Sequence, residues 1–530
     1  MYTSPFPDVE IPDLSVFDYL LGSLSDEDRD RVALIDPASG AETTYAELAT
    51  RVEAFAGALS ARGVGPGVTV GLLCPNAPAF AVAFHGVLRS GATVTTINSI
   101  STVADIEKQL RDADASWLIT VSPLLDAASA AAAEVGLPDD RLIVLDGAAG
   151  HPDLASLLSE SRPAPHVVID PASHVAVLPY SSGTTGVPKG VMLTHRNLVA
   201  NVEQCGPIVD LGSDDRVLAV LPFFHIYGMT MLLNLALRRR ASLVTMPRFV
   251  LEDFLSNIER HRCTYIFIAP PIAVALAKHP SVDDVDVSSV RTLFSGAAPL
   301  DGATAEAAGR RLGARMLQGY GMSELSPVSH AMPAGRGDIP VSSVGVMLPN
   351  QECKLVDLDS GAEITAVGES GETLPGELWV KGPNVMLGYL NKPDATAETL
   401  DSDGFLHTGD IATYNEGGWF TIVDRVKELI KYKGYQIAPA ELEALLLSHP
   451  DIVDAAVIGV LDEESQEIPK AFVVATPGAD LNEEAVVAFV AGHVAPYKKV
   501  RRVEFIDAIP KSASGKILRR ELRARETVLG

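Results

Sequence analysis

Short apolar runs alternate with stretches of helical spacing between about residues 68 and 318. The runs cover 68–73, 93–97, 117–121, 217–221, 243–246, 265–268 and 316–318. Strands that alternate with helical segments are typical of βαβ units, which place their strands in parallel sheets. The alanine-rich stretch 127–134 predicts one surface helix between two of these strands. The pattern therefore predicts an α/β fold of stacked, mostly parallel layers.

The pattern changes after about residue 341. Two β-rich runs, 377–380 and 419–423, are separated by Gly and Asn turns and predict a β-rich subdomain over about 341–425. Beyond residue 426 the order is a strand at 429–432, a helix at 439–448, strands at 455–460 and 471–474, a helix at 483–493 and a strand near Val503. Because 530 residues exceed one compact core, we predict a large N-terminal domain, 1–425, and a small α+β C-terminal domain, 426–530.

Composition narrows the classes of partner. Hydrophobic residues make up 47% and charged residues 21% of the chain, as in ordinary globular proteins, and the formal net charge is −26. That charge argues against nucleic acid or an anionic membrane as a partner. Cys74, Cys205, Cys263 and Cys353 have no zinc-site or disulfide spacing. Without a signal-peptide pattern or an apolar run of membrane-spanning length, we expect a cytoplasmic protein.

The segment 180–190, Tyr-Ser-Ser-Gly-Thr-Thr-Gly-Val-Pro-Lys-Gly, has the residue types of a phosphate-binding loop. Glycines let a phosphate approach the backbone, hydroxyls donate hydrogen bonds, and Lys189 supplies a cation. It differs from a Walker A loop because Pro188 precedes Lys189 and Gly190 follows it. The alternative is a flexible linker, but linkers seldom carry Pro-Lys-Gly between apolar runs. The predicted phosphate-binding residues are Ser181, Ser182, Gly183, Thr184, Thr185, Gly186 and Lys189.

This loop resembles the signature loop of the adenylate-forming superfamily, and three further motifs follow in that superfamily's order. They are Gly-Tyr-Gly-Met-Ser-Glu at 319–324, Leu-His-Thr-Gly-Asp at 406–410 and Pro-Lys-Ser-Ala-Ser-Gly-Lys at 510–516. The segments 221–227 and 424–436 are most similar to the 4-coumarate:CoA ligase-like group. The resemblance covers nearly the whole chain. It implies an ATP-dependent acid:CoA ligase that forms an acyl-adenylate with ATP and Mg²⁺ and then a thioester with coenzyme A.

By this resemblance, two residues of the 319–324 motif contact the phosphates. Glu324 is the candidate Mg²⁺ ligand, since this ion is held by one or two carboxylates together with phosphate oxygens. Ser323 is the candidate α-phosphate contact, with Ser where the family usually has Thr. Taken alone, the Ser-Glu pair would instead indicate the start of a helix with Ser as its N-cap. The ordered set of motifs favours the catalytic interpretation.

The nucleoside contacts are also implied by the resemblance. Asp410 would accept the ribose hydroxyls, Tyr320 would stack on adenine, and Arg425 would add a ribose or phosphate contact. In isolation, Gly-Asp is common turn chemistry and an adjacent Asp-Arg pair is often a surface ion pair. Gln318 and Gly319 would lie along the nucleotide.

The C-terminal domain supplies the remaining candidate groups. Lys516 lies in a Ser-Gly-Lys loop and by resemblance bridges the carboxylate and the α-phosphate, although it could belong to a solvated basic run. The small domain of relatives rotates about a hinge, which is predicted here at 425–427, to admit the pantetheine arm of coenzyme A. The matching hinge and tunnel residues are Lys427, Lys431, Lys433, Gly434 and Gln436, and Arg248 is a candidate contact for a CoA phosphate. An ordinary half-exposed hairpin is the alternative for 431–436.

The acyl pocket implied by the ligase group is nearly all apolar. Phe294 stands where hydroxycinnamate-specific relatives commonly carry Lys, and Thr230 stands where they often carry Asn. His225 is assigned to the pocket without an acid–base role. The predicted wall comprises His225, Ile226, Tyr227, Thr230, Met231, Phe294, Ala297, Gly319, Gly321, Pro327 and Val328. A 4-coumarate-like, cinnamate-like, benzoate-like or medium-chain aliphatic acid fits this wall.

Other functions share these motifs. A medium- or long-chain fatty acyl-CoA ligase has the same set, and luciferase-type oxygenation would be distinguished only by oxygen uptake or light emission. A carrier-protein-loading domain would normally be followed by a carrier segment, and none is visible after Lys516. A non-catalytic adenylate-binding regulator would be expected to lack Lys516, Glu324 or Asp410. Because all three residues are present, we predict an acid:CoA ligase, and the resemblance implies an aryl-propenoic acid of the 4-coumarate or cinnamate type as its substrate.

Overall fold

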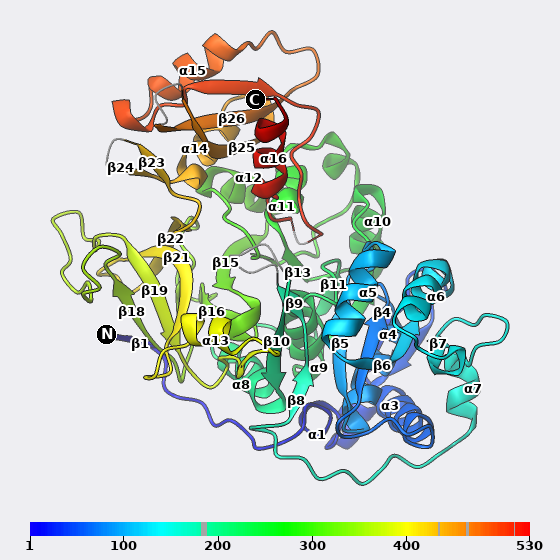
Figure 1. Cartoon of the computed structure of the whole chain (residues 1–530). Coiled ribbons are helices and arrows are strands. Elements are labelled where there is room, and N and C mark those ends of the chain that lie inside the picture. Colours follow the sequence, from blue (N-terminus) through cyan, green and yellow to red (C-terminus); the bar gives the residue numbers. More distant parts are fainter. Residues whose placement is uncertain (182–187, 433–434, 463–465, 514, 530) are drawn as a thin grey trace.

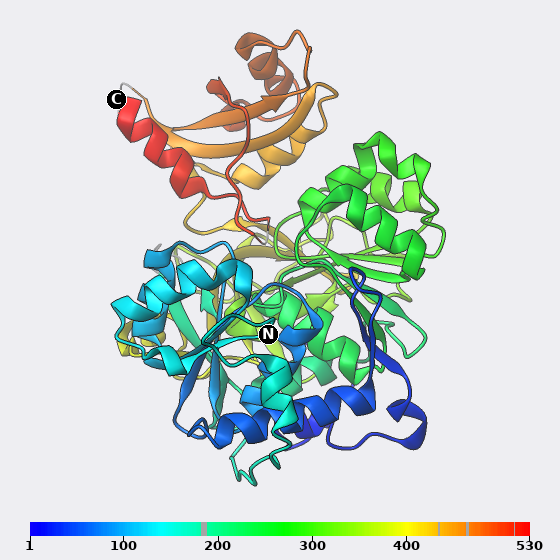
Figure 2. The same ribbon diagram turned by 90° about the vertical axis from the view of Figure 1, so that its right-hand side faces the viewer.

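The computed structural model describes residues 1–181, 188–432, 435–462, 466–513 and 515–529. Its N-terminal body contains three sheets, and a smaller unit formed by the last hundred residues lies at one end of this body (Figure 1 and Figure 2). One hydrophobic core runs from Val16 to Phe420, and separate cores beginning at Ile430 belong to the C-terminal unit. None of the helices in the described part of the chain is long and apolar enough to cross a membrane.

The first sheet has eight strands in the described residues and carries the expected runs at 68–73, 93–97 and 117–121. β4 pairs in parallel with β5 and β6, so both faces of these strands are covered by helices and their side chains are mostly buried. β10 is antiparallel to β8. The strands are β4 (Thr69–Leu73), β5 (Thr93–Ile97), β6 (Ala115–Thr120), β7 (Leu142–Val144), β8 (Val175–Val177), β9 (Tyr180–Ser181), β10 (Lys189–Thr194) and β20 (Gly388–Tyr389).

The second sheet has nine strands in the described residues and includes the expected strands at 217–221, 243–246, 265–268 and 316–318. Its centre is parallel, with β13 paired to β14 and β14 paired to β15. The strands in spatial order are β17 (Val346–Met347), β16 (Val328–Ala331), β15 (Arg315–Gly321), β14 (Thr292–Ser295), β13 (Tyr265–Ile268), β11 (Arg216–Ala219), β12 (Ser242–Thr245), β2 (Val32–Ile35) and β3 (Glu42–Thr44).

Some helices begin at a capping residue. Thr194, the last residue of β10, caps α8 in a capping box with Asn197, and Thr44 caps α3 with Glu47 in the same way. The helices of the body are α1 (Val16–Leu20), α2 (Asp26–Arg29), α3 (Tyr45–Ser60), α4 (Pro78–Arg89), α5 (Val103–Asp112), α6 (Leu125–Glu134), α7 (Leu154–Ser159), α8 (His195–Cys205), α9 (Leu235–Arg238), α10 (Leu251–His261), α11 (Pro270–Lys278), α12 (Gly302–Leu312) and α13 (Pro393–Thr399).

The third sheet is antiparallel and corresponds to the predicted β-rich subdomain. The chain's first strand pairs with β18, so residues about 350 apart in sequence lie side by side. The pairing of β19 with β21 contains an irregularity between His407 and Ile411, a stretch that includes Asp410. The strands are β1 (Tyr2–Thr3), β18 (Glu352–Val356), β19 (Gly376–Lys381), β21 (Leu406–Tyr414) and β22 (Phe420–Arg425).

The C-terminal unit mixes a three-stranded sheet with helices. β25 and β26 are antiparallel, whereas β26 and β27 are parallel and joined through α15. A small apolar cluster of Ile411, Leu429 and Ala438 connects this unit with β21. Its elements are β23 (Ile430–Tyr432), β24 (Tyr435–Ile437), α14 (Pro439–Leu447), β25 (Ile452–Leu461), β26 (Glu467–Ala475), α15 (Glu483–Ala491), β27 (Arg502–Phe505) and α16 (Arg519–Leu529).

The mixed α/β fold class predicted from the sequence is confirmed, and differences are confined to element ends. The strand expected at 217–221 ends at Ala219, and beyond this end the Leu221 carbonyl accepts from the Asn76 side-chain amide at 2.8 Å. The strand expected at 316–318 continues to Gly321, since its last residues pair with β16. The helix expected at 127–134 spans Leu125–Glu134.

Candidate active site

The sequence motifs converge between the N-terminal body and the C-terminal unit. β15 delivers residues 318–321, β21 and β22 deliver Asp410 and Arg425, and the segment between β27 and α16 delivers Lys516. In both views this last segment descends from the C-terminal unit into the body (Figure 1 and Figure 2). Lys516 lines the same cavity as His225 and Tyr320. Residues from opposite ends of the chain therefore share one site.

The predicted phosphate loop is closed by a strand pair. Lys189 of β10 lies opposite Ser181 of β9, and Gly190 lies opposite Tyr180. The Lys189 ammonium is buried, with 7% of the residue exposed, and its Nζ lies 4.7 Å from the centre of the Tyr389 ring. The cation is therefore held by its aromatic neighbour beside the loop. Five predicted loop residues, Ser182, Gly183, Thr184, Thr185 and Gly186, lie outside the described residues.

Glu324 is a buried carboxylate between two hydroxyl groups. Only 2% of the residue is exposed, and its Oε1 accepts hydrogen bonds from Ser181 Oγ at 2.9 Å and Tyr389 Oη at 2.8 Å. Ser323 precedes it in a short 3₁₀ turn and lines the cavity. The described residues contain no group of three or more potential metal-ligating side chains. A metal here would therefore take one protein carboxylate and further oxygens from the nucleotide, which suits Mg²⁺.

Asp410 accepts one hydrogen bond on each carboxylate oxygen. Tyr320 Oη donates to Oδ2 at 2.5 Å and Arg425 Nε donates to Oδ1 at 2.9 Å, while only 5% of the Asp410 side chain is exposed. The neighbouring carboxylate raises the pKa of Arg425, and burial together with Asp410 raises the pKa of Tyr320 well above its usual value. The guanidinium thus stays charged and the phenol stays protonated. Since each carboxylate oxygen has a second lone pair, Asp410 retains capacity for two more donors.

Gln318 is buried next to Gly319, which lines the cavity. The side-chain amide of Gln318 donates hydrogen bonds to the Leu300 carbonyl, at 3.0 Å, and to the Val341 carbonyl. This side chain therefore connects two loops. A Cβ at Gly319 would lie 2.8 Å from the Phe294 ring. Only glycine therefore lets Phe294 approach the strand this closely.

Lys516 reaches the cavity from a tight turn. Gly515 has a φ of +83°, and a Cβ there would lie 3.1 Å from Pro271 Cδ at the start of α11. Ser512 Oγ accepts from the Lys516 amide at 3.1 Å, which fixes the turn. Burial and the charge of Arg425 lower the pKa of Lys516, while Asp410 and Glu324 act in the opposite direction. The enclosed ammonium therefore lies among the charged groups that surround the nucleotide site.

A small cavity of about 40 Å³ with both apolar and polar lining residues opens beside Lys516. Tyr227 forms one wall, and its hydroxyl donates to the Phe294 carbonyl at 3.2 Å. A Cβ at Gly296 would lie 3.0 Å from the Tyr227 ring, so glycine again permits a close approach of an aromatic side chain. The lining residues are His225, Ile226, Tyr227, Phe294, Gly296, Ala297, Gly319, Tyr320, Gly321, Met322, Ser323, Pro327, Val328 and Lys516.

Two residues assigned to the pocket from the sequence do not line this cavity. Thr230 is fully buried in a π-helix at Gly228–Asn234, and its hydroxyl donates to the Ser326 carbonyl at 2.9 Å. Met231 is also fully buried, with its sulfur 3.7 Å from Cys205 Sγ. Buried polar groups need partners, so the Thr230 hydroxyl is used inside the core.

His225 is neutral in this site. Burial, with a smaller effect of Lys516, lowers the pKa of His225 to about 3. Its Nδ1 accepts a hydrogen bond from the Tyr227 amide at 3.2 Å, which places the imidazole proton on Nε2. A group with so low a pKa is not matched to proton transfer at neutral pH. The geometry agrees with a pocket role for His225.

The predicted coenzyme A contacts lie apart from the cavity. Lys431 and Gln436 face each other on the β23–β24 hairpin and are exposed, and Lys427 is exposed in the turn after β22. Figure 1 shows this hairpin on the other side of the C-terminal unit from the segment that carries Lys516. Arg248 is exposed in the loop after β12. Lys433 and Gly434 lie outside the described residues.

Three site residues were not predicted from the sequence. Tyr389 contacts both Glu324 and Lys189, and Gly296 and Met322 line the cavity. Gly296 and Met322 are adjacent in sequence to Ala297 and Ser323, which were predicted to belong to the site. Their position next to predicted site residues could therefore have identified them. Tyr389 is 65 residues from Glu324, and its contact depends on the pairing of β20 with β10.

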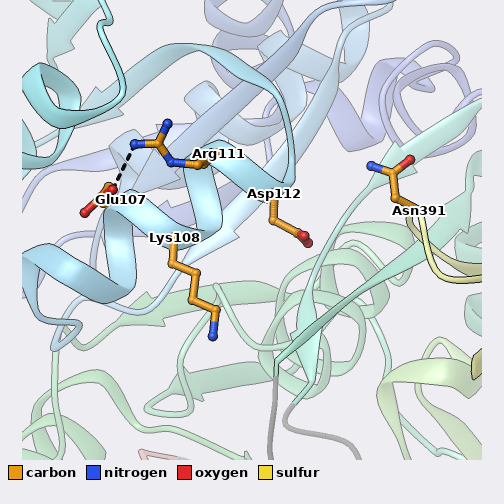
Figure 3. A pocket seen from close by; sticks show the side chains of 5 residues that line it. All are labelled: Glu107, Lys108, Arg111, Asp112 and Asn391. Carbon is orange, nitrogen blue, oxygen red and sulfur yellow. Dashed lines mark hydrogen bonds and ion pairs between the residues drawn. The ribbon is translucent and has the colours of Figure 1, made fainter.

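A second, more open cavity of about 470 Å³ is lined only by polar side chains. Figure 3 shows Glu107, Lys108, Arg111 and Asp112 on α5 and Asn391 on a separate segment, and Arg111 and Glu107 form an ion pair of 2.9 Å. This polar lining does not suit the apolar part of an organic acid. The cavity beside Lys516 is therefore the candidate acyl site.

Comparison with known proteins identifies the family of the chain. The family model described as AMP-binding enzyme matches residues 25–390, and the AMP-binding enzyme C-terminal domain matches residues 441–516. The 4-coumarate–CoA ligase 5 of Oryza sativa subsp. japonica is 42% identical over 99% of this chain and 97% of its own length. The 4-coumarate–CoA ligase 1 of Solanum tuberosum is also 42% identical, over 99% of this chain and 96% of its own length.

Solved structures give the same result. The ATP-bound MatB of Rhodopseudomonas palustris has a TM-score of 0.86 and 28% identity, covering 96% of this chain and 98% of its own. The anthranilate CoA ligase AuaEII in complex with anthranoyl-AMP has a TM-score of 0.88 and 26% identity, covering 98% of both chains. The chain therefore belongs to the AMP-binding enzyme family, as an AMP-forming acid–thiol ligase.

Proposed function

We propose that the protein joins an aryl-propenoic acid of the 4-coumarate or cinnamate type to coenzyme A. The cavity beside Lys516 is the observation that carries the proposal, because Tyr227 and Phe294 line it together with Tyr320 and Ser323 of the proposed nucleotide site. Relatives named as 4-coumarate–CoA ligases, at 42% identity over 99% of the chain, support the same class of acid. ATP, Mg²⁺ and coenzyme A are the other reactants.

In the first step the substrate carboxylate attacks the α-phosphorus of ATP, an acyl-adenylate forms, and pyrophosphate leaves. In the proposal Asp410 accepts the ribose hydroxyls, Tyr320 packs on adenine, and Ser323 donates to the α-phosphate. Glu324 holds Mg²⁺ against the phosphates, and Lys189 adds a buried cation at the loop between β9 and β10. Catalysis of this type depends on positioning and on charge stabilisation.

Lys516 is proposed to bridge the carboxylate and the α-phosphate. Its ammonium is enclosed in the cavity and is influenced by Asp410, Glu324 and Arg425. A cation that is already in position stabilises the charge that develops as the acyl-adenylate forms, without a cost of reorganisation.

In the second step the thiol of coenzyme A attacks the acyl carbonyl and AMP leaves. Lys516 lines the cavity in this conformation, and we propose that the C-terminal unit moves to admit the thiol. We propose the turn at 425–427 as the hinge. Lys427, Lys431, Lys433, Gly434 and Gln436 are the proposed contacts of the pantetheine arm, and Arg248 is a proposed contact of a CoA phosphate.

The pocket predicts little preference for a ring hydroxyl. Phe294 is 1% exposed and its ring is 5.5 Å from that of Phe267, so this part of the wall is aromatic. Tyr227 lines the cavity, but its hydroxyl already donates a hydrogen bond to the Phe294 carbonyl. An apolar pocket discriminates by roughly 1–3 kcal/mol per methylene-sized change, whereas a polar pocket strongly rejects ligands that leave its groups unpaired. Cinnamate should therefore be used about as well as 4-coumarate.

The test is a comparison of kcat/KM for cinnamate, 4-coumarate, benzoate and octanoate, with pyrophosphate release and thioester formation measured separately. We expect the two propenoic acids to agree within about tenfold, a difference of ~1.4 kcal/mol. F294K should shift the preference toward 4-coumarate, whereas F267L, which changes only the packing behind the wall, should not. A hundredfold preference of the unmodified protein for 4-coumarate, or for octanoate, would contradict the proposed pocket.

We place the protein in the cytoplasm. All four cysteines are buried free thiols, and a reducing compartment is the setting in which thiols persist unpaired.

A further inference from the structure

The segment that presents Asp410 is an irregular part of the third sheet. Glu377 of β19 pairs with Ile411 of β21, but Trp379 pairs with His407, so two steps along β19 correspond to four along β21. Residues 408–410 therefore form a bulge opposite Leu378. Bulges near active sites re-aim side chains and leave backbone groups outside the regular ladder. The bulge here turns Asp410 toward Tyr320 and Arg425.

The carboxylate of Glu377 binds the backbone of this bulge. Its Oε1 accepts from the Gly409 amide at 3.0 Å, and its Oε2 accepts from the Trp379 indole at 2.9 Å. Gly409 has a φ of +69°, a conformation that favours glycine. The other side of the bulge is held by Thr408, whose hydroxyl donates to the Leu378 carbonyl at 2.7 Å and accepts from the Asp410 amide at 3.1 Å.

Trp379 is itself fixed, so it can direct the carboxylate. Its ring stacks on His407, with centroids 3.5 Å apart and planes 15° from parallel, and Lys354 Nζ lies 4.5 Å from its centre. Glu377 and Trp379 share one face of β19 because they are two residues apart. The indole therefore holds one carboxylate oxygen while the other faces Gly409.

The same bulge is connected to the proposed hinge. The Gly409 carbonyl accepts from the Val426 amide at 2.9 Å, immediately after β22 ends at Arg425. Asp410 and Arg425 are also partners in the pairing of β21 with β22. A change in the backbone at Gly409 would thus move Asp410 and its guanidinium partner together.

We infer that Glu377 is a positioning residue for the ribose-binding carboxylate of Asp410. It acts through the Gly409 amide and sets the orientation of the bulge. The inference rests on the proposed function, in which Asp410 binds the nucleotide. Removing Glu377 leaves the Gly409 amide without its charged acceptor, and hydrogen bonds to charged groups are the stronger ones. The expected consequence is a higher KM for ATP with little change in the KM for the acid.

The first experiment measures ATP–pyrophosphate exchange for E377A and E377Q, with E352Q as the matched control. Glu352 is a carboxylate on β18 of the same sheet and lies opposite Lys381. We expect the KM for ATP to rise about tenfold in E377A and the KM for the acid to stay within about twofold. Thermal unfolding of each variant separates misfolding from misplacement. Equal increases in both KM values, at an unchanged melting temperature, would overturn the inference.

A second experiment uses the pairing with Trp379. In E377Q the side-chain amide oxygen can still accept from the Gly409 amide. The side-chain NH₂ group then faces the indole N–H of Trp379, and two donors cannot form a hydrogen bond with each other. Adding W379F removes one donor. If Glu377 acts as inferred, E377Q/W379F should recover ATP affinity that E377Q loses. Failure of the double variant to recover any of it would contradict the role of the indole in directing Glu377.

Comparison with D410A distinguishes the inference from the function on which it rests. If D410A leaves the KM for ATP unchanged, the proposed role of Asp410 is wrong. If D410A raises it, E377A should add little in the D410A background, because both changes remove the same contact. Fully additive effects would show that Glu377 acts independently of Asp410 and would refute the positioning role.

Discussion

Replacing Lys516 by Ala should separate the two half-reactions. In this structure the ammonium of Lys516 is enclosed in the acyl cavity and lies within the electrostatic influence of Asp410, Glu324 and Arg425. It enters from a turn fixed by Gly515 against Pro271 and by Ser512. The change removes one preorganised cation and leaves the nucleotide contacts of the N-terminal body in place.

The expected loss follows from the type of interaction. Removing a single preorganised group that stabilises transition-state charge costs roughly 10²–10³-fold in rate, or about 2.7–4 kcal/mol. Burial lowers the pKa of Lys516, which indicates a poorly hydrated site where charge interactions are strong. We therefore expect the upper part of this range for adenylation. Attack of coenzyme A on supplied acyl-adenylate should change by less than about threefold, since Lys516 is assigned no part in that step.

The assay measures each half-reaction separately. ATP–pyrophosphate exchange reports acyl-adenylate formation, and thioester production from supplied acyl-adenylate reports the second step. K511A is the matched control, because Lys511 lies on the same segment but pairs with Asp454 at 2.6 Å. It should retain both activities. If K516A exchanges pyrophosphate at nearly the wild-type rate, or if K511A fails in the same way, the assigned role of Lys516 is incorrect.

Two further predictions concern the same turn. Gly515 and Gly478 have φ values of +83° and +84°, but a Cβ at Gly515 would lie 3.1 Å from Pro271 while nothing lies within 4 Å of one at Gly478. Both G515A and G478A should lose about 1–2 kcal/mol of folding stability. Only G515A should also slow pyrophosphate exchange. Equal exchange rates in the two variants would show that the turn tolerates displacement. The pKa of Lys516 is lowered from 10.5, so its cation is lost as pH rises through a value below 10.5. The alkaline limb of kcat/KM for adenylation, which reports the free enzyme, should lie below that value and be absent in K516A, and a limb at or above 10.5 would contradict the enclosed ammonium.

Local patterns in the sequence were sufficient for most of the fold. The strands Thr93–Ile97 and Tyr265–Ile268 have the predicted bounds, because a short run of β-branched and aromatic residues is recognisable from composition and spacing alone. The helix α14 begins at Pro439 as predicted, since proline is suited to the first turn. Strand ends were less predictable. β15 extends to Gly321 because β16 is beside it, and the partner is not visible in a local window.

The sequence by itself determined the candidate catalytic groups, because they occur in ordered motifs that resemble those of a known family and whose residue types match the demands of phosphate binding and charge stabilisation. The tertiary structure decided which of them meet. Tyr389 contacts Glu324 because β20 pairs with β10. The Thr230 hydroxyl donates a hydrogen bond to the Ser326 carbonyl inside the core. Such contacts depend on distances between segments far apart in the chain.

The orientation of Asp410 was likewise a tertiary result. Its motif is evident in the sequence, but the bulge opposite Leu378 and the carboxylate of Glu377 that supports it arise from the register between two strands. A shift of pairing by one residue reverses the face on which each side chain lies. The resemblance of its motif therefore pointed to Asp410, and only the packed sheet determined where its carboxylate is directed.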